Sequence, residues 1–147
     1  MGDAVKTTWK RQSDLLRNDA DSVGTANSTR ILIADPHINA SNLLETRLRT
    51  AGYSMTRVAY SAHAALAIAA EFEPSVVLVE LNLFDMSGYE LARLLRERGM
   101  PGSDLRLMAM TSSREQVGPE LAHVRGFERY LIKPVVDFSF LSGSQES

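Results

Sequence analysis

Four polar side chains each come at the end of an apolar run, and their types could do chemistry together. They are the carboxylates of Asp35 and Glu80, the hydroxyl of Thr111 and the ammonium group of Lys133. Carboxylate oxygens bind hard divalent cations, and a cation and a lysine can together neutralise the charge of a phosphoryl group. At one edge of a sheet, four such groups would form a small crevice for a divalent cation or a phosphoryl group.

The apolar runs that precede these side chains are typical of buried strands. The clearest is VVLV at residues 76–79, which has no polar alternation, as in a strand covered on both faces. Ligand crevices in open parallel sheets lie at the carboxyl ends of the strands. We expect five strands, over residues 30–34, 53–60, 76–80, 105–110 and 127–132.

Helical periodicity predicts a helix after each of the first four strands, over residues 39–51, 62–72, 89–98 and 114–124. We expect Asn39 or Ser41 to cap the first of them, Ser61 to cap the second, and Ser87-Gly88 to start the third. Its inward face would consist of Ala40, Leu44, Leu48 and Ala51. Gly118-Pro119 would interrupt the fourth helix, because proline removes an amide donor. This alternation predicts a doubly wound α/β fold with parallel strands, and a last helix that is short or absent.

The totals of the chain fit one domain and exclude several classes of function. Of its 147 residues, 44% are hydrophobic and 23% are charged, which is enough to build a core. The absence of cysteine excludes disulfides, thiolate catalysis and cysteine-ligated metals. A net charge of −2 without a Lys/Arg run argues against direct nucleic-acid binding. There is no secretory leader and no apolar run of ~20 residues, so we expect a cytoplasmic location without membrane contact.

We expect residues 30–136 to form the domain, with a flexible polar extension at 1–29 and a short tail at 137–147. The few bulky apolar residues of the extension include Trp9 and Leu16, and a docking segment for a partner is the alternative interpretation. The apolar residues between 135 and 141 are expected to be exposed and to dock on the domain, on a second copy or on a partner. Three isolated histidines are interpreted as surface residues: His37, His63 and His123.

Four segments together resemble the receiver domain of bacterial response regulators. They are ILIADPH at residues 31–37, VVLVELNLFDMSG at 76–88, MTSS at 110–113 and GFERYLIKP at 126–134. The resemblance implies a flavodoxin-like sheet with the strand order 2-1-3-4-5. It also implies that Thr111 is the switch hydroxyl, Tyr130 the aromatic switch residue and Lys133 the countercharge of the phosphate. Asn82 falls at the position whose carbonyl helps to hold the metal.

The chain departs from the family pattern at three positions. Pro36 stands where the acidic pair has its second carboxylate, Glu80 replaces the phosphoacceptor aspartate, and Phe84 replaces a proline. The metal set would be Asp35, Glu80 and Asn82, but Mg²⁺ demands near-octahedral oxygen geometry and should bind weakly or not at all. Because Glu80 is one methylene longer than aspartate, its carboxylate would be misplaced for in-line phosphoryl transfer.

These features predict an atypical receiver, or pseudo-receiver, that is not an enzyme and requires no cofactor. It would act in two-component signalling as a protein-interaction module, independently of aspartyl phosphorylation. Glu80 would either pair with Lys133 in an inactive site or mimic the phosphorylated state. The expected partners are a histidine kinase, an output domain, another regulator or a second copy in a homodimer.

Two other functions stay open at this point. The first is a receiver that a histidine kinase still phosphorylates with Mg²⁺. The second is a flavodoxin-like binder of a nucleotide or flavin, which is disfavoured because residues 35–39 contain no glycine to cradle a phosphate.

Overall fold

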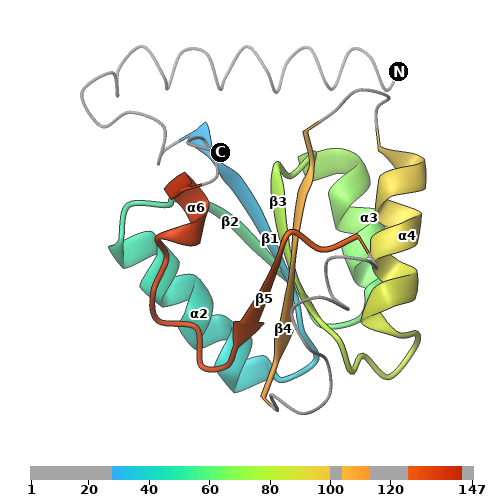
Figure 1. The fold of residues 1–147 in the computed structure, drawn as a ribbon, viewed down its shortest axis with the longest axis horizontal. Coiled ribbons are helices and arrows are strands. Elements are labelled where there is room, and N and C mark those ends of the chain that lie inside the picture. Colours follow the sequence, from blue (N-terminus) through green and yellow to red (C-terminus); the bar gives the residue numbers. More distant parts are fainter. Residues whose placement is uncertain (1–27, 100–103, 113–125, 144–147) are drawn as a thin grey trace.

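The computed structural model describes residues 28–99, 104–112 and 126–143. Its strands are β1 (Arg30–Ala34), β2 (Met55–Ala59), β3 (Val76–Glu80), β4 (Arg106–Thr111) and β5 (Arg129–Ile132). Its helices are α2 (Ile38–Thr50), α3 (Ala62–Phe72), α4 (Gly88–Arg98) and α6 (Phe140–Gly143). The strands form one parallel sheet in the order β2-β1-β3-β4-β5 (Figure 1), which confirms the predicted fold class and strand order. The helix predicted over residues 114–124 lies outside the described residues.

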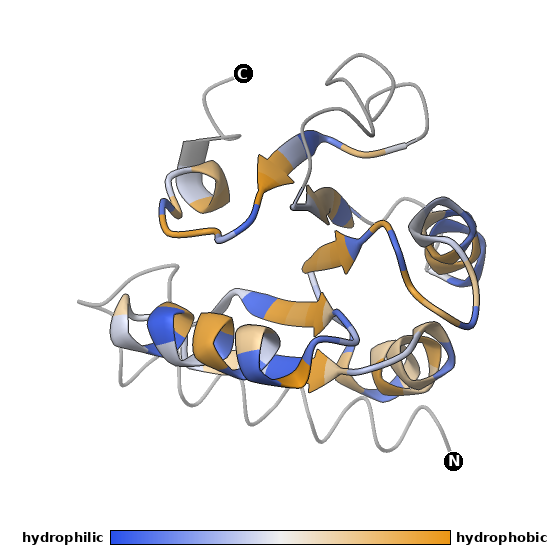
Figure 2. Cartoon of the chain, turned by 90° about the horizontal axis from the view of Figure 1, so that it is seen from below, coloured by the Kyte–Doolittle hydropathy of each residue, from blue (hydrophilic) through white to orange (hydrophobic). Residues whose placement is uncertain are grey.

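Helices cover both faces of the sheet (Figure 1), so the fold is doubly wound. On one face, the α3 and α4 side chains Leu66, Leu91 and Leu95 pack in one core with strand residues such as Val77 and Val79. On the other face, α2 and α6 pack in a second core with strand residues such as Ile33 and Leu78. Figure 2 shows the orange, apolar strands between helices that carry blue residues on their outer sides. Adjacent residues of each central strand therefore face opposite cores, and this explains the unbroken apolar runs.

The strand register brings the functional ends of the strands to one edge of the sheet. Ala34 pairs with Val79, and Glu80 pairs with Met110. Thr111 pairs with Ile132, the last residue of β5. Asp35 follows β1, Glu80 and Thr111 end β3 and β4, and Lys133 follows β5. These four residues are therefore close in space although they are far apart in the sequence.

Two of the three long helices within the described residues begin as the sequence predicts. The Ser61 hydroxyl accepts a hydrogen bond from Ala64 N (3.0 Å) at the start of α3, and the Ser87 hydroxyl accepts one from Glu90 N (3.1 Å) at the start of α4. Such caps typically stabilise a helix by ~1 kcal/mol. Both predicted helix starts are confirmed.

The start of α2 differs from the prediction. The N-cap residue is His37, not Asn39 or Ser41, and the Ser41 hydroxyl donates to His37 O (2.8 Å) inside the first turn. As a result Ser41 is buried, while Ala40 and Ala51, predicted to face inward, are exposed. The helix begins directly after a turn that the Asp35 side chain forms, which the apolar spacing alone does not reveal.

The C-terminal apolar residues pack back onto the domain. Val135, Phe140 and Leu141 are buried in the core on the α2 side, whereas Val136 is 64% exposed. The Arg106 guanidinium holds this segment by donating to the carbonyl oxygens of Phe140 (2.6 Å) and Leu141 (3.1 Å). The expectation of an exposed apolar cluster was therefore wrong, and docking on the domain itself is the observed alternative. The last helix, α6, is short, as predicted.

Among the residues that the structure describes, no helix is both long enough and apolar enough to cross a membrane.

Candidate functional site

Lys133 joins the ends of three strands. Its Nζ donates a hydrogen bond to Oδ2 of Asp35 (2.7 Å), which follows β1, and another to Oε1 of Glu80 (2.8 Å), which ends β3. Asp35 is only 1% exposed and Glu80 3%. We call these three residues the Lys133 triad. The sequence predicts that these strand ends meet. In the structure, the three charged side chains are in direct contact.

The second oxygen of each carboxylate is also engaged. Asp35 Oδ1 accepts a hydrogen bond from His37 N (2.9 Å), and Glu80 Oε2 accepts one from Asn82 N (3.0 Å). Both bonds join a side chain to the backbone two residues further on, so each turn orients its own carboxylate. Each carboxylate therefore has one oxygen held by a turn and the other held by Lys133.

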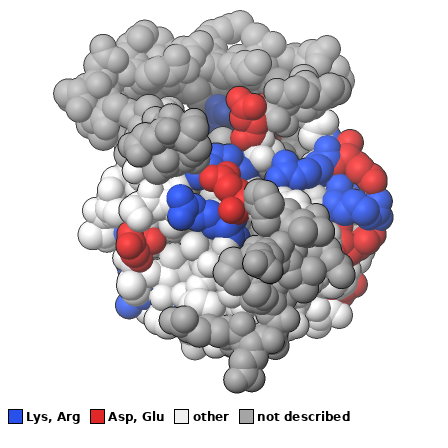
Figure 3. Space-filling view, viewed as in Figure 1, with Lys and Arg blue, Asp and Glu red and all other residues white. Residues whose placement is uncertain are grey.

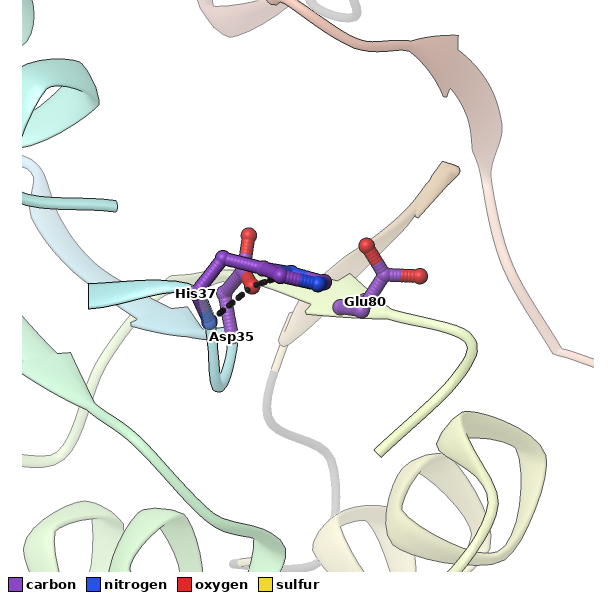
Figure 4. A group of neighbouring side chains, drawn as sticks. All are labelled: Asp35, His37 and Glu80. Atoms are coloured by element: carbon purple, nitrogen blue, oxygen red, sulfur yellow. Dashed lines mark hydrogen bonds and ion pairs between the residues drawn. The ribbon is translucent and has the colours of Figure 1, made fainter. Parts of the chain in front are cut away.

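His37 is a surface residue, as predicted, but it is not isolated, because it belongs to the same site. Its ring is 61% exposed, but its Nδ1 lies 2.8 Å from Asp35 Oδ1 and 3.4 Å from Lys133 Nζ. Figure 4 shows the ring extending from the Asp35 side of the crevice toward Glu80. The signal in the sequence is an aspartate followed by proline, which favours a turn that brings the second residue after the aspartate back to its carboxylate.

The charge of Lys133 is stabilised where it lies. Burial alone lowers the pKa of Lys133, because a low-dielectric environment disfavours the ammonium form. Hydrogen bonds to Asp35 and Glu80, together with their negative charges, outweigh this effect and raise the pKa above its ordinary value of 10.5. Lys133 is therefore a permanent cation of the crevice at neutral pH.

The site contains potential metal ligands, but they do not suit Mg²⁺. One oxygen each of Asp35 and Glu80 and a ring nitrogen of His37 lie within 4.8 Å of one another. Mg²⁺ prefers a shell of oxygens, and Pro36 offers no side-chain oxygen. The Lys133 ammonium already binds both carboxylates. A metal ion on these ligands would share the carboxylates with this ammonium and would lack a carboxylate at residue 36, so the residues present fit a resident Mg²⁺ ion poorly.

The remaining predicted site residues lie around the triad with different exposures. Thr111 ends β4 and is fully buried, and its carbonyl accepts a hydrogen bond from Lys133 N (2.8 Å). Tyr130 lies in the middle of β5, opposite Ala109, and packs partly buried against the core on the α3 and α4 side. Asn82 is exposed, and its contact with the triad is the backbone hydrogen bond to Glu80.

The loop after Glu80 is fixed at two points. Gly88 N donates to Leu81 O (3.0 Å), and a Cβ atom at residue 88 would lie 2.8 Å from the carbonyl oxygen of Glu80. Asp85 accepts hydrogen bonds from Ala62 N (3.0 Å) and His63 N (2.9 Å), so it caps α3 from outside that helix. Asp85 thus connects the loop after β3 to the start of α3.

His63 also contacts Asp85. Its exposed ring places Nδ1 2.7 Å from Asp85 Oδ2, so it is a surface residue, as predicted, but it has a partner. Burial by itself raises the pKa of the Asp85 carboxyl. The hydrogen bonds from the backbone of residues 62 and 63 and from the His63 ring outweigh burial, and the net pKa lies below the ordinary value.

Comparison with known proteins assigns the family. The sequence model of the response regulator receiver domain matches residues 31–141. The chain belongs to this family. It is a receiver domain of two-component response regulator signalling, a signalling module and not a typical enzyme.

Curated relatives include two kinds of regulator. The chain is similar to the DNA-binding response regulator MtrA of Mycobacterium tuberculosis (strain ATCC 25618 / H37Rv), with 30% identity over 106 residues. That match covers 71% of this chain and 44% of MtrA. It is also 27% identical over 108 residues, or 74% of this chain, to the probable transcriptional regulator ycf27 of Cyanophora paradoxa, of which 43% is covered. The chain thus spans less than half the length of these relatives.

Solved structures agree with the fold. A CheY-like receiver domain protein from Methanospirillum hungatei JF-1 is 25% identical, with a TM-score of 0.65, over 80% of this chain and 91% of that one. A CheY-like receiver domain from Methylobacillus flagellatus is 24% identical, with a TM-score of 0.67, over 80% of this chain and 96% of that one. These similarities support the same five-stranded architecture.

Proposed function

We propose that this receiver is a protein-interaction module whose phosphorylation site is closed by the Lys133 triad. Asp35 and Glu80 each use both oxygens in hydrogen bonds, and one bond from each goes to Lys133. This observation carries the proposal. The internal ammonium group takes the place that a divalent cation would need, and the module acts without Mg²⁺-dependent aspartyl phosphorylation.

The chemistry of phosphoryl transfer supports this proposal. A carboxylate that attacks a phosphoryl donor must present an oxygen in line with the leaving group, with a metal ion to neutralise the developing charge. Both Glu80 oxygens are held, one by Lys133 and one by Asn82 N. Attack would have to come from an oxygen that already accepts a hydrogen bond, and the metal would have to enter a crevice that already contains a cation.

A module that acts without phosphorylation would signal through contacts with other proteins. Lys133 connects the end of β5 to the ends of β1 and β3, so the triad fixes the position of the adjoining loops without a ligand. The partners of this fixed form would be a histidine kinase, an output domain, another regulator or a second copy of the chain. We place the module in the cytoplasm.

We propose that this domain does not bind nucleic acid directly. On the face seen in Figure 3, positive and negative side chains of the described residues are interspersed, without a large patch of one sign. On α4, for example, Arg93 pairs with both Glu90 and Glu97. Tracking a phosphate backbone requires clustered positive charge.

The test is intact-mass measurement after incubation with acetyl phosphate and Mg²⁺. We expect the wild-type chain to gain no phosphoryl group. The matched variant is Pro36→Asp combined with Glu80→Asp, which rebuilds the carboxylate pattern of the family and should gain more of the phosphorylated species than the wild type. A phosphorylated wild-type species that disappears in Glu80→Gln would overturn the proposal in favour of an ordinary phosphoacceptor.

A further inference from the structure

A groove lies at the opposite edge of the sheet from the Lys133 triad. It has a volume of about 380 Å³ and is bounded by the C-terminal halves of α3 and α4 and by the residues that lead into β3 and β4. Its apolar lining includes Leu66, Ala69, Leu95 and Leu105. Nothing in the chemistry of the triad uses this groove, which is large enough to hold one or two bulky side chains.

The N-terminal segment of the chain joins the domain at the mouth of this groove. Ser75, which lines the groove, accepts a hydrogen bond through its hydroxyl from Arg30 N (3.3 Å). Ser75 N in turn donates to Arg30 O (2.9 Å). The 27 residues that precede Ser28 therefore connect to the domain beside the groove, outside the part of the chain that the structure describes.

The sequence of that segment contains a matching set of apolar residues. Val5, Trp9 and Leu16 are spaced by four and seven residues, so they would share one face of a helix. Most of the other residues of the segment are polar or charged. The match to the receiver family begins only at residue 31, so this apolar pattern is not required by the receiver fold.

We propose that the N-terminal segment docks into this groove of its own domain, with Trp9 as the main anchor. The eleven residues between Leu16 and Ser28 can span roughly 36–40 Å when extended, which is enough to reach a groove that begins at Ser75. Because the segment is tethered, its effective concentration at the groove is in the millimolar range, and modest contacts are sufficient for docking.

Charge complementarity supports the same occupant. Lys10 and Arg11 directly follow Trp9, and the rim of the groove carries the carboxylates of Glu73 and Asp104. Arg98, also on the rim, would face an acidic residue of the segment such as Asp14. The proposal is independent of how the Lys133 triad works, because the groove and the triad lie at opposite ends of the strands.

Fluorescence of Trp9, the only tryptophan of the chain, tests the proposal in the full-length protein. We expect a blue-shifted emission maximum and acrylamide quenching several-fold weaker than in a free peptide of residues 1–27. Ala70→Arg puts a bulky positive charge on the groove lining, where it should expel the segment and raise quenching to the level of the peptide. Ala67→Arg is the matched control, since Ala67 is exposed on the same helix but outside the groove lining.

Three results would overturn the proposal. The first is a wild-type Trp9 as accessible as in the free peptide. The second is a shielded Trp9 that responds to Ala67→Arg as much as to Ala70→Arg, which would place the segment elsewhere. The third is shielding that appears only at high protein concentration, which would make a second copy the occupant.

A measurement on the groove side completes the test. In the full chain, Trp9→Ala should shift the methyl NMR signals of Leu66 and Leu95. The signals of Leu44, in the core on the other face of the sheet, should stay in place. Unchanged Leu66 and Leu95 signals would contradict the docking.

Discussion

The Nζ atom of Lys133 lies 2.8 Å from Glu80 Oε1, although β3 and β5 are not neighbours in the sheet. The contact crosses over the end of β4 and continues to Asp35 beyond β3. A buried ion pair of this kind adds little net stability over an apolar replacement, but removing one partner leaves uncompensated charge. Removing any one member of the triad should therefore destabilise the domain.

Lys133→Met should destabilise the domain strongly, because it leaves the buried carboxylates of Asp35 and Glu80 without their cation. We expect a loss of about 3–5 kcal/mol in the free energy of unfolding at pH 7, measured by urea denaturation. Adding Glu80→Gln to Lys133→Met should recover part of the loss, since one of the orphaned charges is then removed. A loss below ~1 kcal/mol, as for surface ion pairs, would mean that the contact contributes little.

The contribution of Lys133 should depend on pH in the alkaline range. Its pKa is raised in the folded state, so its stabilisation is fully present below the ordinary value of 10.5 and is lost as the pH rises through the higher folded-state pKa. The measurement is the difference in unfolding free energy between wild type and Lys133→Met, followed from about pH 8 to about pH 11. A difference that already declines at the lower end of this pH range would contradict the raised pKa.

Local sequence signals predict much of this architecture. The predictions that fail do so for identifiable physical reasons. The VVLV run at residues 76–79 and the serines at 61 and 87 act locally, so they predict β3 and two helix starts correctly. The role of His37 depends on a turn made by the Asp35 side chain, which no periodicity reveals. The docked position of Phe140 involves contacts far apart in the sequence, such as the hydrogen bond to its carbonyl oxygen from Arg106, 34 residues away.

The candidate site, like the fold, is predictable from the sequence only in part. The meeting of Asp35, Glu80 and Lys133 follows from parallel strand order, because parallel strands end at one edge. The use of both oxygens of each carboxylate depends on side-chain rotamers and turn geometry, which the sequence does not specify.

Asp85→Ala should weaken the start of α3, because the carboxylate accepts hydrogen bonds from the amides of Ala62 and His63. The expected loss at pH 7 is about 0.5–2 kcal/mol, as for other helix caps. The pKa of Asp85 is lowered on folding. Its contribution is therefore fully present above the ordinary value of 3.8 and is lost as the pH falls below it. Urea denaturation of both proteins at several acidic pH values checks this, and a constant difference down to the lowest pH would contradict it.

Gly88→Ala should disturb the loop that carries Asn82. The added Cβ would lie 2.8 Å from both Glu80 O and Leu81 Cα, and these backbone atoms cannot rotate away. We expect a loss of about 1–3 kcal/mol and a shifted Asn82 amide NMR signal. Ser87→Ala, which removes only the neighbouring helix cap, serves as the comparison and should leave the Asn82 signal nearly unchanged. Equal signals in Gly88→Ala and wild type would show that the loop adapts without moving the site.

The central claim is that Lys133 fills the cation position of the crevice, and a Mg²⁺ titration followed by NMR tests it most directly. The amides of His37 and Asn82 are the natural reporters, since each is hydrogen-bonded to one of the two carboxylates. We predict no saturable shift of either amide in the wild type, and a saturable shift when Pro36→Asp and Glu80→Asp are combined. Saturable Mg²⁺ binding by the wild-type chain at low millimolar concentration or below would contradict the account.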